Sequence, residues 1–155
     1  AAHGGKRCDD VLTVGSELEV CSRVADLYPK NYYAWTQRTW VVRRGQRSLP
    51  PAEGEALLDR ELEFVAGWLR GHVSDHSALN HRKNVVLLLV DMQLAQGGPA
   101  AALSTLRREL SLSSQLLRDY PGHESLWCFR RFACQATLLC LAHPASSATA
   151  AAAAA

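Results

Sequence analysis

Isoleucine is absent from this sequence, and the other β-branched residues are sparse: threonine occurs six times and valine 11 times. Alanine and leucine, by contrast, each occur 23 times. Because β-branched residues favour strands while alanine and leucine favour helices, this composition argues against a β-sandwich, a β-barrel or a doubly wound sheet. We therefore expect an all-α protein.

Long apolar runs are also missing. The longest one, Val85 to Val90, has six residues, whereas a membrane-spanning helix needs about 18 or more. We expect this run to lie in a buried helix and the protein not to span a membrane. We find no signal-peptide pattern or lipidation motif, so the predicted location is the cytoplasm.

The cysteines contain no C-x-x-C pair, and their number is odd. They are Cys8, Cys21, Cys128, Cys134 and Cys140. Zinc-ribbon and redox-motif interpretations therefore fail, and so does a disulfide scaffold. The sequence favours buried free thiols in a reducing compartment.

Excess charge of one sign is lacking too. A net charge of +2 is too small for a general nucleic-acid binder, which needs a concentrated basic surface. Three basic doublets occur, at Arg43-Arg44, Arg107-Arg108 and Arg130-Arg131. They fall in different predicted helices with acidic neighbours, so we expect exposed charges there and no nucleic-acid partner.

Two groups of polar residues superficially suggest a metal site or a catalytic site. His72 and His76 are four residues apart with Asp75 between them, but a predicted turn breaks the helical spacing that a metal site would need. The acidic run from Asp59 to Glu63 is interpreted as a solvated helix face. We therefore expect no metal site and no catalytic residue in this chain.

Apolar residues recur at helical spacing in six stretches. We expect helices over about 18–28, 34–45, 51–72, 75–95, 103–120 and 126–141. The second is expected to end at Arg43-Arg44-Gly45, because cations in the last turn followed by glycine are typical of a helix end. Links of two to four residues within each pair predict three antiparallel hairpins.

The turn segments within the hairpins resemble one another. Residues 28–38 read YPKNYYAWTQR and residues 120–130 read YPGHESLWCFR, so that tyrosine, proline, tryptophan and arginine coincide at an offset of 92. Residues 75–82, DHSALNHR, keep the alanine and the arginine. A two-helix unit with this period predicts an α-α solenoid. We place its repeats at about 12–45, 52–96 and 100–142 in one domain, residues 1–149, and regard the alanine tail 150–155 as uninformative.

The first turn segment resembles a known repeat. Its pattern Lys-Asn-Tyr-x-Ala-Trp-x-x-Arg is similar to the repeat of protein prenyltransferase α subunits, Asn-Tyr-x-x-Trp-x-x-Arg. HVSDHS at 72–77 and YPGHE at 120–124 narrow the resemblance to the divergent α-subunit repeat-containing members of that family. The resemblance covers about residues 16–142. Since the family usually has five or so repeats, and no initiator methionine is present, we expect this chain to be a fragment.

The resemblance implies a function. In that family the α subunit wraps as a crescent around an α/α-barrel β subunit, which holds the catalytic zinc and most of the isoprenoid pocket. The chain would then be a non-zinc α-type subunit of a protein geranylgeranyltransferase, inactive alone. Its expected partners are a β subunit of the Rab geranylgeranyltransferase type, an isoprenoid diphosphate and an acceptor protein with a C-terminal cysteine.

The resemblance also points to substrate-binding residues. Lys30, Tyr32 and Tyr33 match the family segment that contacts the isoprenoid diphosphate or the acceptor peptide, and His76 adds a donor at the next equivalent helix start. Unpaired N–H groups at such starts favour anions. The alternative is that Lys30 is simply solvated and the tyrosines only touch the partner subunit.

The remaining motif residues are interpreted as structural. Asn31 and Asp75 suit helix N-caps, whereas His123 is a poorer one. The tryptophans would plug grooves between neighbouring hairpins, and the arginines would bind carbonyls or a carboxylate at the same seams. These residues are Trp35, Trp127, Arg38, Arg82 and Arg130. Leu79 replaces the tryptophan in the middle repeat.

A second hypothesis belongs to a different class. The chain could be a non-enzymatic α-solenoid scaffold whose concave surface binds a partner helix. The Lys-Asn-Tyr start of the second helix distinguishes the two hypotheses, because a scaffold would not need it.

Overall fold

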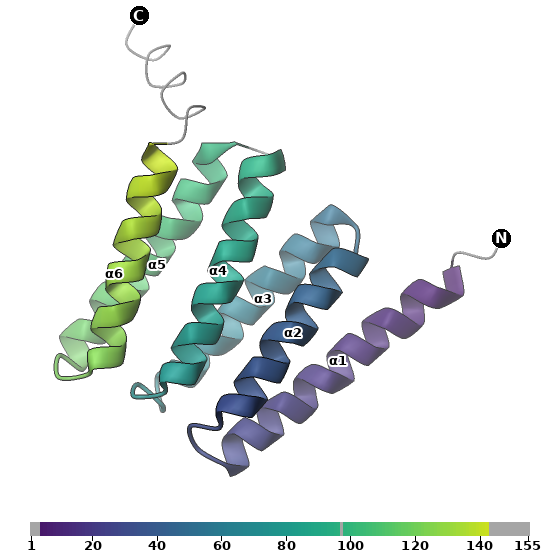
Figure 1. Ribbon diagram of the computed structural model, residues 1–155, viewed down its shortest axis with the longest axis horizontal. Helices are drawn as coiled ribbons and strands as arrows, with labels where there is room; N and C mark the ends of the chain where they lie inside the picture. Colours follow the sequence, from purple (N-terminus) through teal and green to yellow (C-terminus); the bar gives the residue numbers. More distant parts are fainter. Residues whose placement is uncertain (1–3, 97, 143–155) are drawn as a thin grey trace, which may run out of the picture. The chain divides into compact units, whose positions relative to one another are not determined.

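The computed structural model describes the backbone of residues 4–96 and 98–142, and the side chains from residue 13 onward within those ranges. The described residues form six α-helices and no strand, which confirms the all-α prediction. The helices are α1 (Gly4–Leu27), α2 (Tyr32–Ser48), α3 (Pro51–Leu69), α4 (His76–Gln96), α5 (Pro99–Asp119) and α6 (Glu124–Leu141) (Figure 1). The chain divides within α4 into two compact units, Ala1–Val85 and Val86–Ala155.

Unit 1 contains α1, α2, α3 and the first half of α4. The turn between α1 and α2 carries Pro29 and then Lys30, whose φ of 62° lies in the left-handed region. Asn31 caps α2, because its Oδ1 accepts from the backbone N–H of Ala34 at 3.1 Å. Asp75 caps α4 in the same way, since its Oδ1 accepts from Ser77 N and Ala78 N. Both predicted N-caps are therefore confirmed.

The predicted end of α2 is wrong. The helix continues through Gly45 to Ser48, because this glycine serves packing rather than termination. A Cβ at Gly45 would lie 3.1 Å from Leu57 Cδ2 and from Val14 Cγ2, so that α1 and α3 both approach the α2 backbone here. Only glycine allows that approach without movement of its neighbours.

The predicted link between α3 and α4 is too short. α3 ends at Leu69 rather than at His72, and residues 70–75 form the connection. Arg70 N and Gly71 N donate to carbonyls three residues back, Gly67 O and Trp68 O, which tightens the end of the helix. His72 therefore lies in the turn and stacks on Trp68, with ring centroids 4.0 Å apart.

Unit 2 contains the second half of α4, α5 and α6, and α5 and α6 form a hairpin through residues 120–123. Pro99 opens α5, where its missing N–H is harmless. His123 is the N-cap of α6 but makes no side-chain capping bond, as its chemistry predicted. The hairpin core includes Leu106, Leu126 and Ala133, each fully buried.

The apolar run is helical and mostly buried: Val85, Val86, Leu89 and Val90 are in the core, whereas Leu87 is 38% exposed. None of the helices in the described part is long and apolar enough to cross a bilayer.

The prediction of buried thiols holds only in part. Of the cysteines with described side chains, Cys21 and Cys140 are buried, but Cys128 and Cys134 are exposed. Cys8 lies outside the described side chains.

Candidate functional site

Trp35 joins α2 to the start of α4. Its side chain is 2% exposed, and its ring packs against Phe64 and Trp68 of α3 with centroids 6.5 and 5.4 Å away. Its Nε1 donates to Asp75 Oδ2 at 3.1 Å. The capping aspartate of α4 is therefore held by α2, and Trp35 plugs the groove between hairpins as its spacing predicted.

Arg38 links three helices at the same seam. Its Nε and Nη2 donate to the two carboxylate oxygens of Glu61 in α3. Its Nη1 donates to Leu18 O at 2.8 Å and to Ser22 Oγ at 2.7 Å, both in α1. The guanidinium also lies 4.0 Å from the ring centroid of Phe64. Arg38 binds both a carbonyl and a carboxylate, as predicted.

The acidic run in α3 is not a uniformly solvated face, and that interpretation was wrong for its central residue. Glu61 is 3% exposed, whereas Glu63 is exposed. The helix turns Glu61 toward α2 and α4, where Arg38 and His81 compensate its charge. Burial alone would raise the pKa of Glu61, but hydrogen bonds from His81 and Arg38 and the positive charge of Arg38 hold it below its ordinary value.

His81 of α4 completes this network. Its Nε2 lies 2.7 Å from Glu61 Oε1, and its Nδ1 lies 2.7 Å from Thr39 Oγ1. Burial lowers the pKa of His81, and the charges of Arg38 and Arg82 lower it further, against the opposing effect of Glu61. Since the Glu61 carboxylate only accepts, Nε2 of the ring donates to it, while the single hydroxyl proton of Thr39 is shared between His81 Nδ1 and Trp35 O, which lies 2.9 Å from Thr39 Oγ1.

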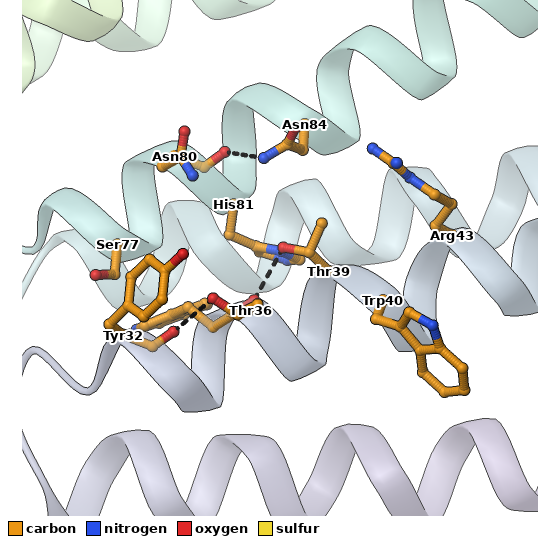
Figure 2. A pocket seen from close by; sticks show the side chains of 10 residues that line it. Tyr32, Thr36, Thr39, Trp40, Arg43, Ser77, Asn80, His81 and Asn84 are labelled. Atoms are coloured by element: carbon orange, nitrogen blue, oxygen red, sulfur yellow. Dashed lines mark hydrogen bonds between the residues drawn. The ribbon is translucent and has the colours of Figure 1, made fainter.

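A pocket of about 270 Å³ opens above this network, between α2 and the first half of α4. Its lining is Tyr32, Trp35, Thr36, Thr39, Trp40, Arg43, Ser77, Asn80, His81 and Asn84 (Figure 2). Trp35 and His81 are buried, at 2% and 1% exposure, and form its floor. Arg43 and Trp40 are exposed, which places them at its rim.

The lining is rich in neutral hydrogen-bonding groups. Asn80 and Asn84 lie one turn apart on α4, and Asn84 Nδ2 donates to Asn80 O at 2.9 Å. Thr36 and Thr39 face them from α2 (Figure 2). Arg43 is the cation at the rim, and no carboxylate is among the lining residues. The pocket therefore suits polar neutral groups or an anion, held by amides, hydroxyls and a guanidinium.

The predicted substrate-binding residues fall in two places. Tyr32 lines the pocket. Lys30, Tyr33 and His76 are exposed and lie outside its lining, although Tyr33 packs against Tyr32 with ring centroids 5.6 Å apart. The sequence analysis missed the polar lining residues Thr36, Asn80 and Asn84. The only signal for them was their position on helix faces close to the repeat motif, with Asn80 and Asn84 one turn apart.

The other motif arginines are bound within their hairpins. Arg82 is buried and donates to Leu62 O. Arg130 is half-buried and donates from Nη1 to Ser114 Oγ at 2.6 Å and to Leu110 O at 3.4 Å. Leu79 is 4% exposed, so it keeps the apolar packing of the position.

Trp127 plugs no groove among the described residues, so its predicted role stays a prediction. The side chain is 55% exposed, and its Nε1 donates to Pro121 O in its own turn at 3.0 Å. The reason is its place in the array: Trp35 is covered by the helix that follows its hairpin, whereas no helix follows α6 among the described residues.

Metal-binding groups do not converge anywhere in the described part of the chain: no three His, Cys, Asp or Glu residues there could hold one ion. The predicted turn does separate His72 from His76.

Three stretches of the chain, residues 14–45, 58–89 and 106–137, match the protein prenyltransferase alpha subunit repeat, and together they cover more than half of it. The chain belongs to this family. Each match ends in the second helix of a hairpin and contains one motif arginine, Arg38, Arg82 or Arg130.

Several curated relatives share the repeats. Protein prenyltransferase alpha subunit repeat-containing protein 1 of Homo sapiens is 34% identical over its match, which covers 76% of this chain. The protein of the same name in Danio rerio is 30% identical over its match, which covers 84% of this chain. The geranylgeranyl transferase type-2 subunit alpha of Sus scrofa is 27% identical over its match, which covers 75% of this chain.

The chain spans about a third of the length of the repeat-containing relatives, 35% of both the human and the Danio rerio protein. It spans 19% of the transferase subunit from Sus scrofa.

Proposed function

We propose that this chain is part of the α-type subunit of a heterodimeric protein prenyltransferase, which supports transfer of a geranylgeranyl group to a cysteine of an acceptor protein. The observation that carries the proposal is the family repeat together with its exposed start: Lys30, Tyr32 and Tyr33 stand free of the core at the N-terminus of α2. Likeness to a geranylgeranyl transferase type-2 subunit alpha supports the choice of reaction.

In the proposed heterodimer, this chain and the β subunit would have different roles. The transfer joins the first carbon of the prenyl chain to the cysteine sulfur and releases diphosphate. A zinc ion that activates the acceptor thiol would belong to a β subunit of the Rab geranylgeranyltransferase type. This chain would contribute anion binding and docking surface.

The start of α2 has features that suit a diphosphate. Tyr32 and Tyr33 are the first two helical residues, and their N–H groups add to the positive end of the helix dipole. Lys30 supplies an exposed ammonium beside them. Its left-handed backbone, φ 62°, fixes its position at the turn rather than in the helix.

The start of α4 lies beside that of α2, because Asp75 binds Trp35 and because Ser77 and Tyr32 line one pocket. His76 is exposed at this second start. In the proposed complex the two starts and the pocket would face the reacting groups, and the polar lining would receive part of the acceptor.

The test is reconstitution. The chain is co-expressed with a Rab-type prenyltransferase β subunit, the complex is isolated, and transfer of labelled geranylgeranyl from its diphosphate to a cysteine-terminated acceptor is measured. We expect complex formation and transfer that needs both subunits. A chain that binds no β subunit would instead favour the scaffold hypothesis.

Variants then test the site. Lys30→Asn removes the charge while asparagine tolerates the left-handed backbone, and Tyr32→Phe removes the hydroxyl. We expect the double variant to assemble normally and to turn over at least about tenfold more slowly, the effect of losing one or two charge-assisted hydrogen bonds. Arg23→Gln removes an exposed charge from α1 and is the matched control. Unchanged turnover in the assembled Lys30→Asn/Tyr32→Phe complex would contradict the site assignment.

A further inference from the structure

The exposed face of α2 near its C-terminal end carries three arginines beside one tryptophan. Counted from Trp40, the arginines follow after three, four and seven residues. Since a helix turns by about 100° per residue, the four positions fall within an arc of about 100°. All four side chains are exposed. We call Trp40, Arg43, Arg44 and Arg47 the α2 basic patch.

The patch surrounds a recess in the surface. A pocket of about 260 Å³ is lined by its four residues and by Ser48. The guanidinium carbon of Arg44 lies 5.8 Å from the ring centroid of Trp40, within the range of a cation–π contact. Trp40 and Arg43 also stand at one end of the larger pocket between α2 and α4 (Figure 2). The three arginines therefore line one common recess.

No carboxylate neutralises the patch within the described part of the chain. α2 contains no aspartate or glutamate, and its remaining arginine, Arg38, binds the buried Glu61. No guanidinium group of the patch forms a hydrogen bond or an ion pair with a residue whose side chain is described. Glu17 of α1 shares a pocket with Arg44 without forming an ion pair. The patch therefore presents three uncompensated positive charges.

The helix dipole explains only part of this cluster. Cations are favoured in the last turn of a helix, and the effect fades within that turn. Arg47 is the basic residue in the last turn of α2, whereas Arg43 and Arg44 lie one turn earlier. Like charges three and four residues apart on a helix also repel each other. A bound anion would relieve this repulsion.

The patch is also not the uncovered end of the helix array. α2 is an inner helix, because α1 and α3 both pack against its opposite side at Gly45, through Val14 and Leu57. The pockets on the two sides of the patch are lined by residues of α1 and of α4. The patch is thus flanked by described helices on both sides, and its exposure does not arise where the array stops.

We propose that the α2 basic patch binds a ligand with two or more phosphoryl groups close together. The guanidinium groups donate to the phosphate oxygens, since the planar fork of arginine matches such oxygens bidentately. A phosphoryl group carries about −1.5 to −2 charges near pH 7, so that two of them balance three arginines. The patch spans about 10 Å along the helix, which suits one compact anion. The ligand is either a soluble phosphorylated molecule or the phosphorylated headgroup of a lipid.

A segment of acidic peptide is a poorer occupant. Each carboxylate carries a single charge, so three of them would have to meet the three guanidinium groups at once. Ordering several flexible side chains costs conformational entropy, which a compact diphosphate avoids. This holds equally for a peptide of a partner and for an acidic stretch of the same protein.

The patch is separate from the prenyl diphosphate site proposed at the start of α2. Arg43 follows Tyr32 by 11 residues. At about 1.5 Å per residue, the two positions are about 16 Å apart along the helix. Binding at the patch therefore does not depend on prenyl transfer.

The test uses the 155-residue protein with Lys30→Asn, which removes the charge at the other end of α2 and leaves the patch intact. Sodium pyrophosphate is titrated into it and binding is followed by isothermal calorimetry. We expect saturable binding, weakened at least about tenfold by Arg43→Gln with Arg47→Gln, because two charge-assisted contacts are lost. Arg23→Gln with Arg131→Gln is the matched control, since it removes the same charge from exposed arginines of α1 and α6 and should leave binding unchanged.

Arginine modification shows where the anion lies. Phenylglyoxal reacts with accessible guanidinium groups, and mass spectrometry identifies the modified residues. With pyrophosphate present, we expect the three patch arginines to react more slowly and Arg23 and Arg131 to react at their original rates. This experiment leaves the patch unsubstituted, so it remains decisive if a double variant folds poorly. Unprotected patch arginines would contradict the proposal.

Vesicles distinguish the two sources of phosphate. The protein is sedimented with phosphatidylcholine vesicles that contain a minor share of phosphatidylinositol bisphosphate. A lipid ligand predicts sedimentation that pyrophosphate reverses and that Arg43→Gln with Arg47→Gln abolishes. A soluble ligand predicts no sedimentation, with pyrophosphate binding retained. Both results support a phosphate site at the patch.

Three other results would overturn the proposal. The first is the absence of saturable pyrophosphate binding. The second is an equal loss of binding in the control double variant, which would indicate diffuse attraction of anions to a basic protein. The third is a hexaglutamate peptide that binds as tightly as pyrophosphate, which would indicate protein carboxylates as the ligand.

Discussion

Arg38 of α2 and Glu61 of α3 form a buried bidentate ion pair in which Nε and Nη2 of the guanidinium each donate to one carboxylate oxygen. Both side chains are 5% exposed or less. The pair closes the seam between the first two hairpins, and Leu18 O, Ser22 and His81 satisfy the remaining polar atoms around it.

Removal of one partner should therefore destabilise the protein strongly. We expect Arg38→Ala to lower the free energy of unfolding by about 3–5 kcal/mol, because it leaves a charged Glu61 buried with less compensation. Urea unfolding followed by circular dichroism measures this. Arg60→Ala, on the exposed side of α3, should change stability by less than about 0.5 kcal/mol. Equal effects of the two changes would contradict the role assigned to Arg38.

Stability should also depend on pH through the same network. The pKa values of Glu61 and His81 both lie below their ordinary values of 4.5 and 6.5. A group with a depressed native pKa binds its proton more weakly when folded, so the unfolded state takes up protons first as the pH falls. The stabilisation is complete above about pH 6.5, declines below it through His81, and declines again below about pH 4.5 through Glu61.

The measurement is urea unfolding at pH 7.5 and pH 5.5, with His81→Asn as the comparison. Each coupled proton contributes a slope of at most about 1.4 kcal/mol per pH unit. The variant is expected to be less stable at pH 7.5 but to lose less stability on going to pH 5.5. A variant with the same loss as the parent would show that His81 is not the titrating group.

The two equivalent tryptophans should respond differently to one substitution. Trp35→Phe removes the donor to Asp75 Oδ2 and leaves that buried oxygen unsatisfied, which should cost about 1–3 kcal/mol of unfolding free energy. Trp127→Phe changes an exposed ring and should cost less than about 0.5 kcal/mol. Thermal or urea unfolding of both variants checks this; a larger cost at Trp127 would be the contrary result.

Gly45 and Gly67 form another matched pair. Gly45→Val would push side-chain carbons into Leu57 and Val14, which already lie 3.1 Å from the Cβ position, and should destabilise by about 1–3 kcal/mol. Nothing lies within 4 Å of the Cβ position at Gly67 in α3. Gly67→Val should therefore be neutral or slightly stabilising, by up to about 0.5 kcal/mol, through better helix propensity. Similar unfolding curves for both variants would refute the packing role of Gly45.

Part of the candidate site could be predicted from the sequence. Tyr32 stands in the repeat motif, and the motif locates the start of α2. His81, Asn80 and Asn84 could not be selected, because polar residues on a helix look alike until the neighbouring helix shows which of them it faces. Glu61 illustrates this most clearly: it is the one buried carboxylate of the acidic run, and it forms an ion pair with Arg38.

The sequence by itself determined the helical class, the two side-chain caps at Asn31 and Asp75, and the family, because these depend on composition, local hydrogen bonding and a repeated motif. Only the tertiary structure decided that Gly45 continues a helix and that Trp127, unlike its equivalent Trp35, is exposed. The same residue type at the same repeat position has opposite surroundings, because burial is set by the helix that packs next to it, and no local pattern encodes that neighbour.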